Sequence, residues 1–507
     1  MLKPTDNFNG ISCTINSTVD CNLRCKYCYE VNKRSLQINE KTVYRFIDRI
    51  LEDPDPIGAD GTEDEWITQT GIILDFIGGD SFMQPEIMDK ALSYFQYKAT
   101  LLNHPYAKNW RASISTNGTL FADPKVQKLI EKYGDNLSIG VSIDGCPEIH
   151  DANRIFTVRG KNGEELGTMS TIMRWWPWLK ERQPDATNHT KSTCSKNSIP
   201  WLYKSLVFMH EPYPKGLGIT YINQNFIMED TGCQEEDYVL LDEMYRKCSK
   251  YLWNHRHEMY WSMFDRQGLN HRSDNILDFK ESIKKGWCGS GAMPSVGMNG
   301  KIYPCFRWLP HTMEDMVKDS DTMCVGNVND GFIHKENFRR VKEASREKIS
   351  SPYCMECEFE GACAYCIGGC YSENHAFKRT EHICFIAKLR SKWARRYWDM
   401  VEETEHTEDD YFSNSDLSII RESTSGGIVE QHTPDGRYHW GNDAKLLPQY
   451  RTPDNPEGNP LLEIPDLPEE YKDAWKYNAK VTVDEGEEIY NDKSVMPVDN
   501  NGNLSIH

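Results

Sequence analysis

The sequence has no long apolar run and no excess of basic residues, and each absence excludes a class of protein. No uninterrupted apolar segment is long enough for a membrane-spanning helix, and the residues after Met1 lack the apolar core of a signal peptide. Lys and Arg total 58 against 77 for Asp and Glu, a net charge of −19. Sequence-independent binding to nucleic acid or to an anionic membrane is therefore not expected. We expect a soluble, cytoplasmic protein.

The negative charge is concentrated at the end of the chain. Residues 401–507 hold 24 acidic and 8 basic side chains, eight of the 24 prolines and no cysteine, whereas the first 400 residues are nearly neutral. A segment of this composition buries little apolar surface. We therefore expect residues 401–507 to form an acidic, Pro-rich tail that is largely solvated, with parts that dock on the body.

Short apolar, β-branched segments alternate with helical patterns in the first half of the chain, as in β/α units around a parallel sheet. The fold class is therefore predicted to be α/β. Six repeats are too few for an eight-stranded barrel, and a (β/α)6 partial barrel or an open doubly wound sheet both fit. Helices are predicted over Glu86–Asn103 and Pro124–Tyr133, and strands near Ile11–Asn16, Ile72–Ile77, Arg111–Ser115, Leu137–Ile143, Lys204–Met209 and Leu217–Ile222.

The second half of the chain changes character twice. Residues 235–285 have a charged, helical pattern and are predicted to bridge two domains. Residues 286–385 are rich in cysteine and glycine, so ligand bonds are expected to shape them more than a hydrophobic core does. A closing helix is predicted from the spacing of Ile386, Leu389, Trp393, Tyr397 and Met400. The predicted divisions are 1–234, 235–285, 286–400 and 401–507.

The 17 cysteines are not expected to form disulfide bonds, because a cytoplasmic protein is expected and the cytosol keeps thiols reduced. The strongest local motif is the CxxxCxxC loop of Cys21, Cys25 and Cys28, which follows the first predicted strand. Three thiolates on one short loop can hold three irons of a [4Fe-4S] cluster and leave the fourth iron open to a small molecule. The alternatives are a zinc knuckle or buried free thiols, but this loop contains no further Cys or His to complete a zinc site.

This loop resembles that of radical S-adenosylmethionine (SAM) enzymes. The resemblance implies a (β/α)6 TIM-like partial barrel and a unique iron that binds the amino and carboxylate groups of SAM. It also implies reductive cleavage of SAM to a 5'-deoxyadenosyl radical, which abstracts a hydrogen atom from the substrate.

Further segments resemble the parts of that family that contact SAM, and all of them lie at predicted strand ends, where ligands bind in α/β sheets. Asp80 stands where the family usually has Glu, which is longer by one methylene group. Arg154 is implied as a partner of the methionine carboxylate. The cofactor-binding residues implied by the resemblance are Gly78, Gly79, Asp80, Ser115, Asn117, Ser142 and Arg154.

A second set of cysteines resembles the SPASM extension of radical SAM enzymes, which binds two auxiliary [4Fe-4S] clusters. The CxGGC piece ending at Cys370 is the closest match. The implied auxiliary ligands are Cys288, Cys305, Cys354, Cys357, Cys363, Cys366, Cys370 and Cys384. The alternative is a zinc module built from two CxxC pairs, although a five-residue gap between the pairs is short for a zinc ribbon.

Two departures from the family pattern leave questions open. One thiol is surplus: the outer cluster would take Cys354, Cys357 and Cys384 with either Cys363 or Cys366. The inner cluster would take Cys288, Cys305 and Cys370, and its fourth ligand is the surplus thiol, a more distant residue or substrate. The remaining cysteines lack cluster spacing and are expected to be ordinary thiols: Cys13, Cys146, Cys194, Cys233, Cys248 and Cys324.

The resemblance implies an enzyme that modifies a peptide or protein by crosslinking, epimerisation or oxidation of a side chain. Its cofactors would be SAM and three [4Fe-4S] clusters, and an external donor such as flavodoxin or ferredoxin would supply electrons. The alternatives are a radical SAM enzyme acting on a small molecule or carbohydrate, and a non-catalytic iron-sulfur or zinc protein. Sulfatase maturation is disfavoured, because Phe306 stands where those relatives carry a catalytic Asp. No residue is assigned as the general base.

Overall fold

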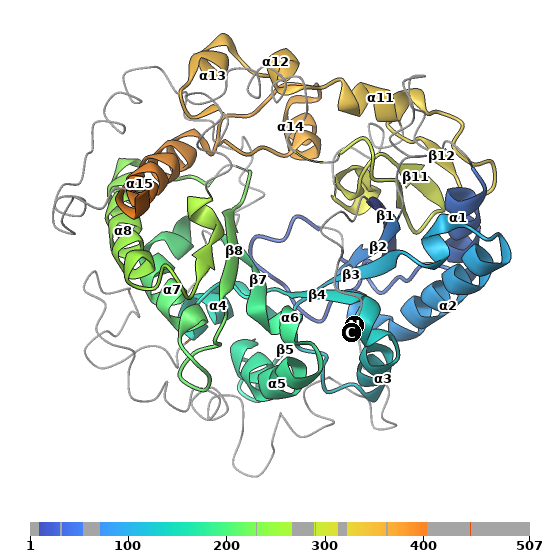
Figure 1. Cartoon of the computed structure of the whole chain (residues 1–507), viewed down its shortest axis with the longest axis horizontal. Coiled ribbons are helices and arrows are strands. Elements are labelled where there is room, and N and C mark those ends of the chain that lie inside the picture. Colours follow the sequence, from blue (N-terminus) through green and yellow to red (C-terminus); the bar gives the residue numbers. More distant parts are fainter. Residues whose placement is uncertain are drawn as a thin grey trace.

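Six parallel strands from two adjoining sheets form the curved centre of this computed structural model, with helices on its outer side (Figure 1). The structure describes residues 10–30, 33–53, 71–229, 231–265, 288, 290–312, 322–360, 363–402 and 447. Strands β1 to β4 pair in parallel in chain order, and β7 and β8 continue the curve. A parallel bridge between Ser142 and Lys191 joins the two groups. This is a partial (β/α)6 barrel, as the sequence predicts.

Strands β1 to β4 and helices α2 and α3 fall close to their predicted bounds, whereas the strand predicted near Leu217–Ile222 begins four residues later, as β8. The strands are β1 Gly10–Thr18, β2 Gly71–Gly78, β3 Trp110–Thr116, β4 Leu137–Val141, β7 His189–Cys194 and β8 Tyr221–Phe226, with a hairpin of β5 Ile155–Arg159 and β6 Glu165–Gly167 and the short edge strand β9 Tyr260–Trp261. The helices are α1 Glu40–Glu52, α2 Pro85–Leu101, α3 Pro124–Tyr133, α4 Pro147–Asn153, α5 Met169–Arg182, α6 Pro184–Asn188, α7 Leu202–His210 and α8 Glu235–Asn254.

One predicted strand is wrong: Lys204–Met209 lies within helix α7. The buried residues Leu202, Leu206 and Met209 recur at helical spacing, and a short apolar run does not by itself distinguish a buried strand from a buried helix. The fifth barrel strand is instead β7, which sequence reasoning missed. Its six residues include only one apolar side chain, Cys194, so the segment carries no hydrophobic signal.

Local sequence signals explain where the helices begin. Pro124 occupies the first turn of α3, where a missing N–H costs nothing, and the Asp123 side chain accepts a hydrogen bond from the backbone of Lys125. Asn39 caps α1 in the same way. The buried faces of α1 to α3 pack against the sheet, where Ile15 and Phe76 are fully buried. The core therefore lies between the strands and the outer helices.

The cysteine-rich region continues the barrel sheet. Strand β10 (Ser295–Val296) pairs in parallel with β1, and β11 (Lys301–Tyr303) and β12 (Gly326–Asn327) follow as antiparallel neighbours. Short helices then lead to the closing helix. They are α11 Glu336–Lys342, α12 Arg346–Ile349, α13 Pro352–Glu356 and α14 Ile367–Asn374, followed by α15 Cys384–Glu402.

The predicted closing helix is confirmed as α15, which packs along α8 (Figure 1). All five residues of its predicted apolar face are buried, and Trp393 donates a hydrogen bond of 2.7 Å to Asp242 on α8. Helix α8 accounts for the first part of the predicted bridge, while residues 266–285 lie outside the described residues. The acidic tail also lies outside them, except for residues 401 and 402 and Leu447.

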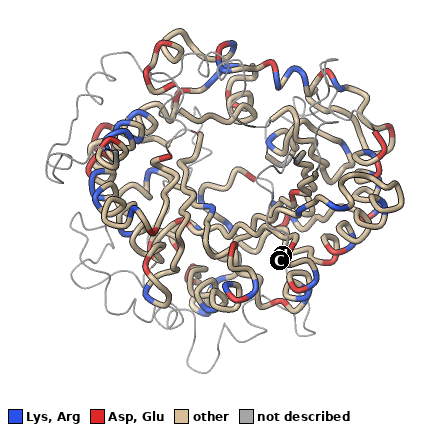
Figure 2. The backbone as a smooth tube through the Cα atoms, in the orientation of Figure 1, with Lys and Arg blue, Asp and Glu red and all other residues tan. Residues whose placement is uncertain are grey.

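Charge is distributed as expected for the first 400 residues. Lys and Arg alternate with Asp and Glu on the outer helices, while the central strands carry few charged residues (Figure 2). Among the described helices, none combines the length and the apolar character needed to cross a bilayer.

Candidate iron-sulfur and cofactor site

The loop with Cys21, Cys25 and Cys28 follows the carboxyl end of β1 and is held from two sides. On one side, the backbone of Asp80 donates a hydrogen bond of 2.9 Å to the carbonyl of Asp20, directly before the first cysteine. On the other side, Arg24 and Lys26 donate backbone hydrogen bonds to the carbonyls of residues 155 and 153. The end of β2 and the segment entering β5 therefore fix the loop in the barrel mouth.

The three thiols lie together in a largely buried environment. Cys21 is buried, and Cys25 and Cys28 are half-buried. Burial, with a smaller contribution from the neighbouring Cys28 thiol, raises the pKa of Cys21 to about 11 and that of Cys25 to about 12. Lys33 and Arg154 act in the opposite direction on Cys25. Three neighbouring thiols that are buried or half-buried are a suitable donor set for a metal cluster, whose cationic irons offset the cost of burying thiolates.

Gly78 and Gly79 allow the strand end to touch this loop. A Cβ atom on Gly78 would lie 1.9 Å from the carbonyl oxygen of Thr18, and one on Gly79 would lie 1.9 Å from that of Asp20. Gly78 also has a positive φ of 137°, which favours glycine. Close backbone approach therefore explains both glycines at this position.

The Asp80 side chain ties together the ends of β2 and β3. Its carboxylate accepts hydrogen bonds from the backbone N–H groups of Asn117, at 2.7 Å, and Phe82, at 3.0 Å, and from the Thr116 hydroxyl, at 3.0 Å. Burial raises the pKa of Asp80 to about 6, although these donors favour the ionised form. Asp80 thus fixes the position of Asn117 at the end of β3.

Asn117 reaches the cysteine loop, whereas Ser115 and Ser142 lie farther along the barrel mouth. The Asn117 amide nitrogen is 3.8 Å from the sulfur of Cys21 and donates a hydrogen bond of 2.9 Å to Asn22. Ser115 instead accepts a hydrogen bond of 2.6 Å from Lys191 on β7. Ser142, which directly follows β4, forms the parallel bridge to Lys191. Of the three, Asn117 is the one placed beside the thiols.

Arg154 lies against the same loop, in a buried ion pair. Its Nε is 3.0 Å from the Asp144 carboxylate, its Nη1 is 3.9 Å from the sulfur of Cys25, and its guanidinium lies 5.4 Å from the centre of the Tyr27 ring. The Tyr27 hydroxyl donates a short hydrogen bond to Asp144. The structure therefore adds Asp144 and Tyr27, whose roles sequence reasoning did not identify, to the surroundings of Arg154.

In the cysteine-rich region, one group of thiols lines a hollow between the segment of α13 and the start of α15. Burial and then the charges of the other three thiols raise the pKa of Cys384 to about 12, which shows how close these four residues lie. The four cysteines that line the hollow are Cys354, Cys357, Cys363 and Cys384.

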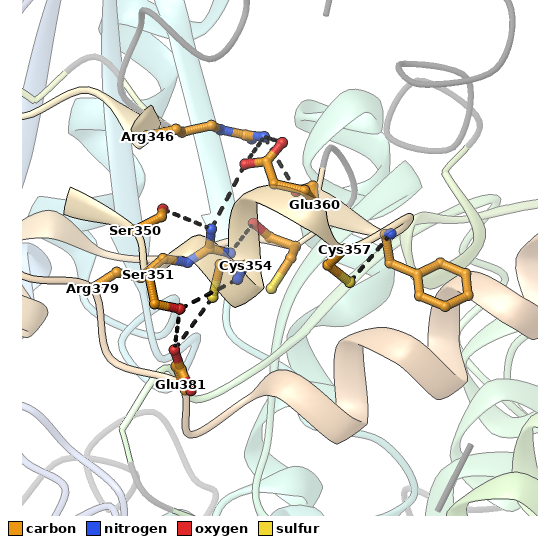
Figure 3. A network of polar contacts seen from close by, with 10 residues as sticks. Arg346, Ser350, Ser351, Cys354, Cys357, Glu360, Arg379 and Glu381 are labelled. Atoms are coloured by element: carbon orange, nitrogen blue, oxygen red, sulfur yellow. Dashed lines mark hydrogen bonds and ion pairs between the residues drawn. The ribbon is translucent and has the colours of Figure 1, made fainter. Parts of the chain in front are cut away.

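Charged residues line this hollow as well (Figure 3). The Cys354 thiol donates a hydrogen bond of 3.4 Å to Glu381. Buried Arg379 donates to the carbonyl of Cys363 at 3.1 Å and lies 3.7 Å from Glu360, which also pairs with Arg346 at 3.0 Å. A buried arginine beside four thiolates offsets part of the negative charge that a cluster with four cysteine ligands brings.

The other four cysteines that the resemblance implies as auxiliary ligands form a second group. Cys366 caps α14, Cys370 lies one turn later, and Cys305 directly follows the strand β11 and Pro304. Cys305 and Cys370 are buried, whereas Cys288 is exposed as a whole residue. Desolvation of the thiol, and in addition the charge of Cys366, raises the pKa values of all three. The structure therefore places Cys363 with the outer group and Cys366 with Cys288, Cys305 and Cys370, the arrangement that the sequence left open.

Arg307 connects this second group to the first cysteine loop, and sequence reasoning missed it. Its guanidinium donates a hydrogen bond of 2.6 Å to Glu229, which follows β8, and lies 4.6 Å from the centre of the Tyr29 ring. A Cβ on Gly368 would lie 2.7 Å from the Cβ of Arg307, so the glycines of the CxGGC motif make room for this side chain. The neighbouring Phe306 ring lies 6.2 Å from that of Tyr29.

Four of the cysteines expected to be ordinary thiols lie away from the three groups, whereas Cys324 packs in the same cluster as Cys305 and Cys370. Cys13, Cys146, Cys194 and Cys248 are buried in the main core. Trp176 and Trp201 are buried there too, and the Trp176 indole donates a hydrogen bond of 2.8 Å to the carbonyl of Leu217. These two tryptophans therefore serve packing.

Comparison with known proteins agrees with this geometry. Residues 15–165 match the family model of the radical SAM superfamily. A serine-type anaerobic sulfatase-maturating enzyme of Bacteroides thetaiotaomicron is 34% identical over 139 residues, which cover 26% of this chain and 29% of that relative. An uncharacterized protein of Methanocaldococcus jannaschii is 29% identical over 152 residues, 30% of this chain and 43% of the relative. The chain thus matches less than half of the length of either relative.

One group of solved structures, those of anSMEcpe, extends the similarity in fold to most of this chain. Native anSMEcpe with bound AdoMet has a TM-score of 0.55 at 18% identity, over 77% of this chain and 99% of that one. SuiB of Streptococcus suis has a TM-score of 0.42 at 14% identity, over 72% of this chain and 74% of that one. The sequence match, the partial barrel and the three-cysteine loop lead to one conclusion: residues 15–165 of this chain are a radical SAM domain.

Proposed function

We propose that this chain is a radical SAM enzyme that modifies a side chain of a peptide or protein substrate. The observation that carries the proposal is the convergence of Cys21, Cys25 and Cys28 at the carboxyl end of β1, beside the ends of β2 and β3. When bound there, a [4Fe-4S] cluster and SAM supply one-electron reduction and hydrogen abstraction.

The residues of this chain would hold and orient that chemistry. Asn117, positioned by Asp80, and Arg154, positioned by Asp144, lie within 4 Å of the sulfurs of Cys21 and Cys25. They are the residues placed to contact a ligand of the open iron. Gly78 and Gly79 keep the strand end in contact with the loop, and the buried cations Lys33 and Arg154 favour anionic groups at this position.

The two further cysteine groups would hold auxiliary [4Fe-4S] clusters. We assign the outer cluster to the hollow lined by Cys354, Cys357, Cys363 and Cys384, and the inner cluster to Cys288, Cys305, Cys366 and Cys370. Four thiols in each group satisfy the full coordination of a [4Fe-4S] cluster. The surplus thiol of the motif thereby becomes the fourth inner ligand, and no substrate contact is needed to complete that site.

A peptide substrate is favoured by the proteins that share the fold. One solved structure is native anSMEcpe with bound AdoMet and the Kp18Cys peptide, with a TM-score of 0.54 at 19% identity over 76% of this chain. Sulfatase maturation itself remains disfavoured by Phe306, which cannot accept a proton. An external donor such as flavodoxin or ferredoxin would supply the electrons. The small-molecule and carbohydrate alternatives are distinguished by incubating the reduced enzyme with candidate peptides and with metabolites.

The first test concerns the site itself. The anaerobically purified chain should carry about twelve irons, four for each cluster. Replacing Cys21, Cys25 and Cys28 together by Ala should remove about a third of this iron and all reductive cleavage of SAM, because the open iron is lost. Cys233→Ala, a half-buried thiol outside the three groups, is the matched control and should keep both. SAM cleavage by the triple variant would contradict the assignment.

The second test concerns the substrate. Reduced enzyme and SAM should produce 5'-deoxyadenosine together with a mass change in a peptide, and the same incubation without the peptide should give only uncoupled cleavage. Peptides rich in Cys, Ser, Asp or Tyr are the first to examine. A product formed from metabolites and never from peptides would exclude the peptide-modifying function while leaving the radical SAM assignment intact.

A further inference from the structure

Two histidines and a glutamate converge on the barrel at a distance from all three cysteine groups. His210 ends helix α7, His255 caps the end of α8, and Glu258 lies just before β9. Their potential ligand atoms all lie within 4.8 Å of one another. Because α7 runs back to the amino end of β8, this cluster lies at the strand edge opposite to the one with the cysteine loop.

The side chains are oriented toward a common point. The Tyr251 hydroxyl lies 2.9 Å from Nδ1 of His210, while Nε2 of the same ring is 3.9 Å from Oε2 of Glu258. Nδ1 of His255 is 3.1 Å from the same oxygen, and the two imidazole rings are 4.8 Å apart in an edge-to-face arrangement. A hydrogen bond at one imidazole nitrogen that leaves the other for a ligand is the usual arrangement of a metal-binding histidine.

The charges around the cluster suit a cation. Two imidazoles and one carboxylate come together here, a donor set that can hold a cation. The next carboxylate, Glu211, lies 3.5 Å from Lys215, and the Arg256 guanidinium is stacked 3.9 Å from the centre of the Trp253 ring. His257 is the remaining titratable neighbour of Glu258.

We propose that His210, His255 and Glu258 bind one divalent transition-metal ion, with Zn²⁺ as the preferred occupant, and that Tyr251 positions His210. Two imidazoles and a carboxylate are a common zinc donor set, which water completes to four ligands. The three ligands come from the ends of α7 and α8 and from the approach to β9. The ion would therefore link three consecutive segments of the barrel and stabilise the folded state, without a part in the radical chemistry.

The test uses the full chain with its iron-sulfur clusters already assembled, so that the cluster cysteines do not compete for the probe. Zn²⁺ is titrated against a competing chelator dye, and zinc and iron are counted in the same sample. The wild type should bind one Zn²⁺ that raises the melting temperature. His255→Ala and Glu258→Gln, at solvent-accessible positions, should weaken binding at least tenfold and abolish the thermal shift, with the iron content unchanged.

Two further variants distinguish a specific zinc site from non-specific binding. Tyr251→Phe should weaken Zn²⁺ binding about 10- to 100-fold, because the orientation of His210 is no longer fixed. Glu211→Gln, a neighbouring carboxylate outside the proposed ligand set, is the matched control and should bind as the wild type does. Equal zinc affinity and stoichiometry in the wild type, His255→Ala and Glu258→Gln would overturn the proposal and leave the cluster as an ordinary His–Glu contact. Because SAM cleavage is not the readout, failure here is independent of the proposed function.

Discussion

The candidate site requires a residue without a Cβ atom at position 79. The residue packs its Cα against the backbone of Asp20, and a Cβ would also lie 3.0 Å from that of Cys21. A backbone carbonyl cannot move away in the way that the end of a flexible side chain can. The glycine therefore fixes the position of the first thiol relative to the ends of β2 and β3.

We expect Gly79→Ala to reduce the iron content by about a third and to abolish SAM cleavage, since the first cysteine loop must shift while the two auxiliary groups stay in place. Iron and chain are quantified together, and the cleavage products of SAM are separated by chromatography. Gly163→Ala is the matched control: Gly163 has a φ of +80°, but its Cβ would meet no atom within 4 Å. Normal iron content and cleavage in Gly79→Ala would show that the loop is less tightly constrained than the structure indicates.

The two thiols that the sequence left interchangeable are separated by their neighbours. Cys363 lines the outer hollow, and Cys366 influences Cys288, Cys305 and Cys370. We expect Cys363→Ser to change the same electron paramagnetic resonance signal as Cys354→Ser, because both alter the ligands of the outer cluster. Cys366→Ser should change the signal that Cys370→Ser changes. If Cys366→Ser instead reproduces the spectrum of Cys354→Ser, the assignment of the two thiols must be exchanged.

Among the elements, the strength of the sequence signal decided what could be predicted. β1 to β4 combine buried apolar side chains with helices of clear periodicity between them, and their bounds were predicted to within a few residues. β7 was missed because its buried residues Thr190 and Ser192 are polar. α7 was mistaken for a strand because its apolar run is short. Long-range neighbours such as Arg307 and Glu229 carry no local sequence signal, so their pairing emerges only in the fold.

The contact between α15 and α8 gives a prediction for one element. Trp393 is fully buried, and its indole donates to Asp242. Trp393→Ala should destabilise the folded state by about 3–5 kcal/mol, through the lost burial and the cavity that remains. Trp393→Phe keeps most of the volume and should cost about 1–3 kcal/mol through the lost hydrogen bond. The free energy of unfolding is measured in denaturant with the clusters assembled.

Arg395→Ala on the same helix is the control for that experiment. Its ion pair with Glu358 spans 2.8 Å, but the two side chains are 34% and 65% exposed, so its loss should cost at most about 1 kcal/mol. A Trp393→Ala variant no less stable than Arg395→Ala would mean that α15 does not close the folded body.

At the scale of the whole molecule, parts distant in sequence support the same site. β10 returns to pair with β1, and Arg307 links the segment after β8 to Tyr29 beside the third cysteine of the loop. The cysteine-rich region is therefore continuous with the barrel sheet. Such continuity brings the second cysteine group close to the barrel mouth, which is where an auxiliary cluster must lie to contact a substrate or to relay electrons.

Leu447 extends this support to the acidic tail. It is buried, with 3% of its surface exposed, and packs against Ile155 at the start of β5. The carbonyl of Ile155 accepts the backbone hydrogen bond of Arg24, within the cysteine loop, at 2.9 Å. The sequence predicted that parts of the tail dock on the body, and the contact between Leu447 and Ile155 is one such point. Ile155 lies two residues after Asn153, whose carbonyl accepts the backbone hydrogen bond of Lys26.

We therefore expect Leu447→Ala to loosen the cysteine loop, because burial of a leucine side chain contributes about 1.5–3 kcal/mol. Hydrogen exchange of the amides of Arg24 and Lys26 should become faster, while the auxiliary cluster signals stay unchanged. Leu101→Ala, at a side chain that is 65% exposed, is the control. A chain that ends after Glu402 should show the same faster exchange. Unchanged exchange at Arg24 in both variants would show that the tail gives the loop no support.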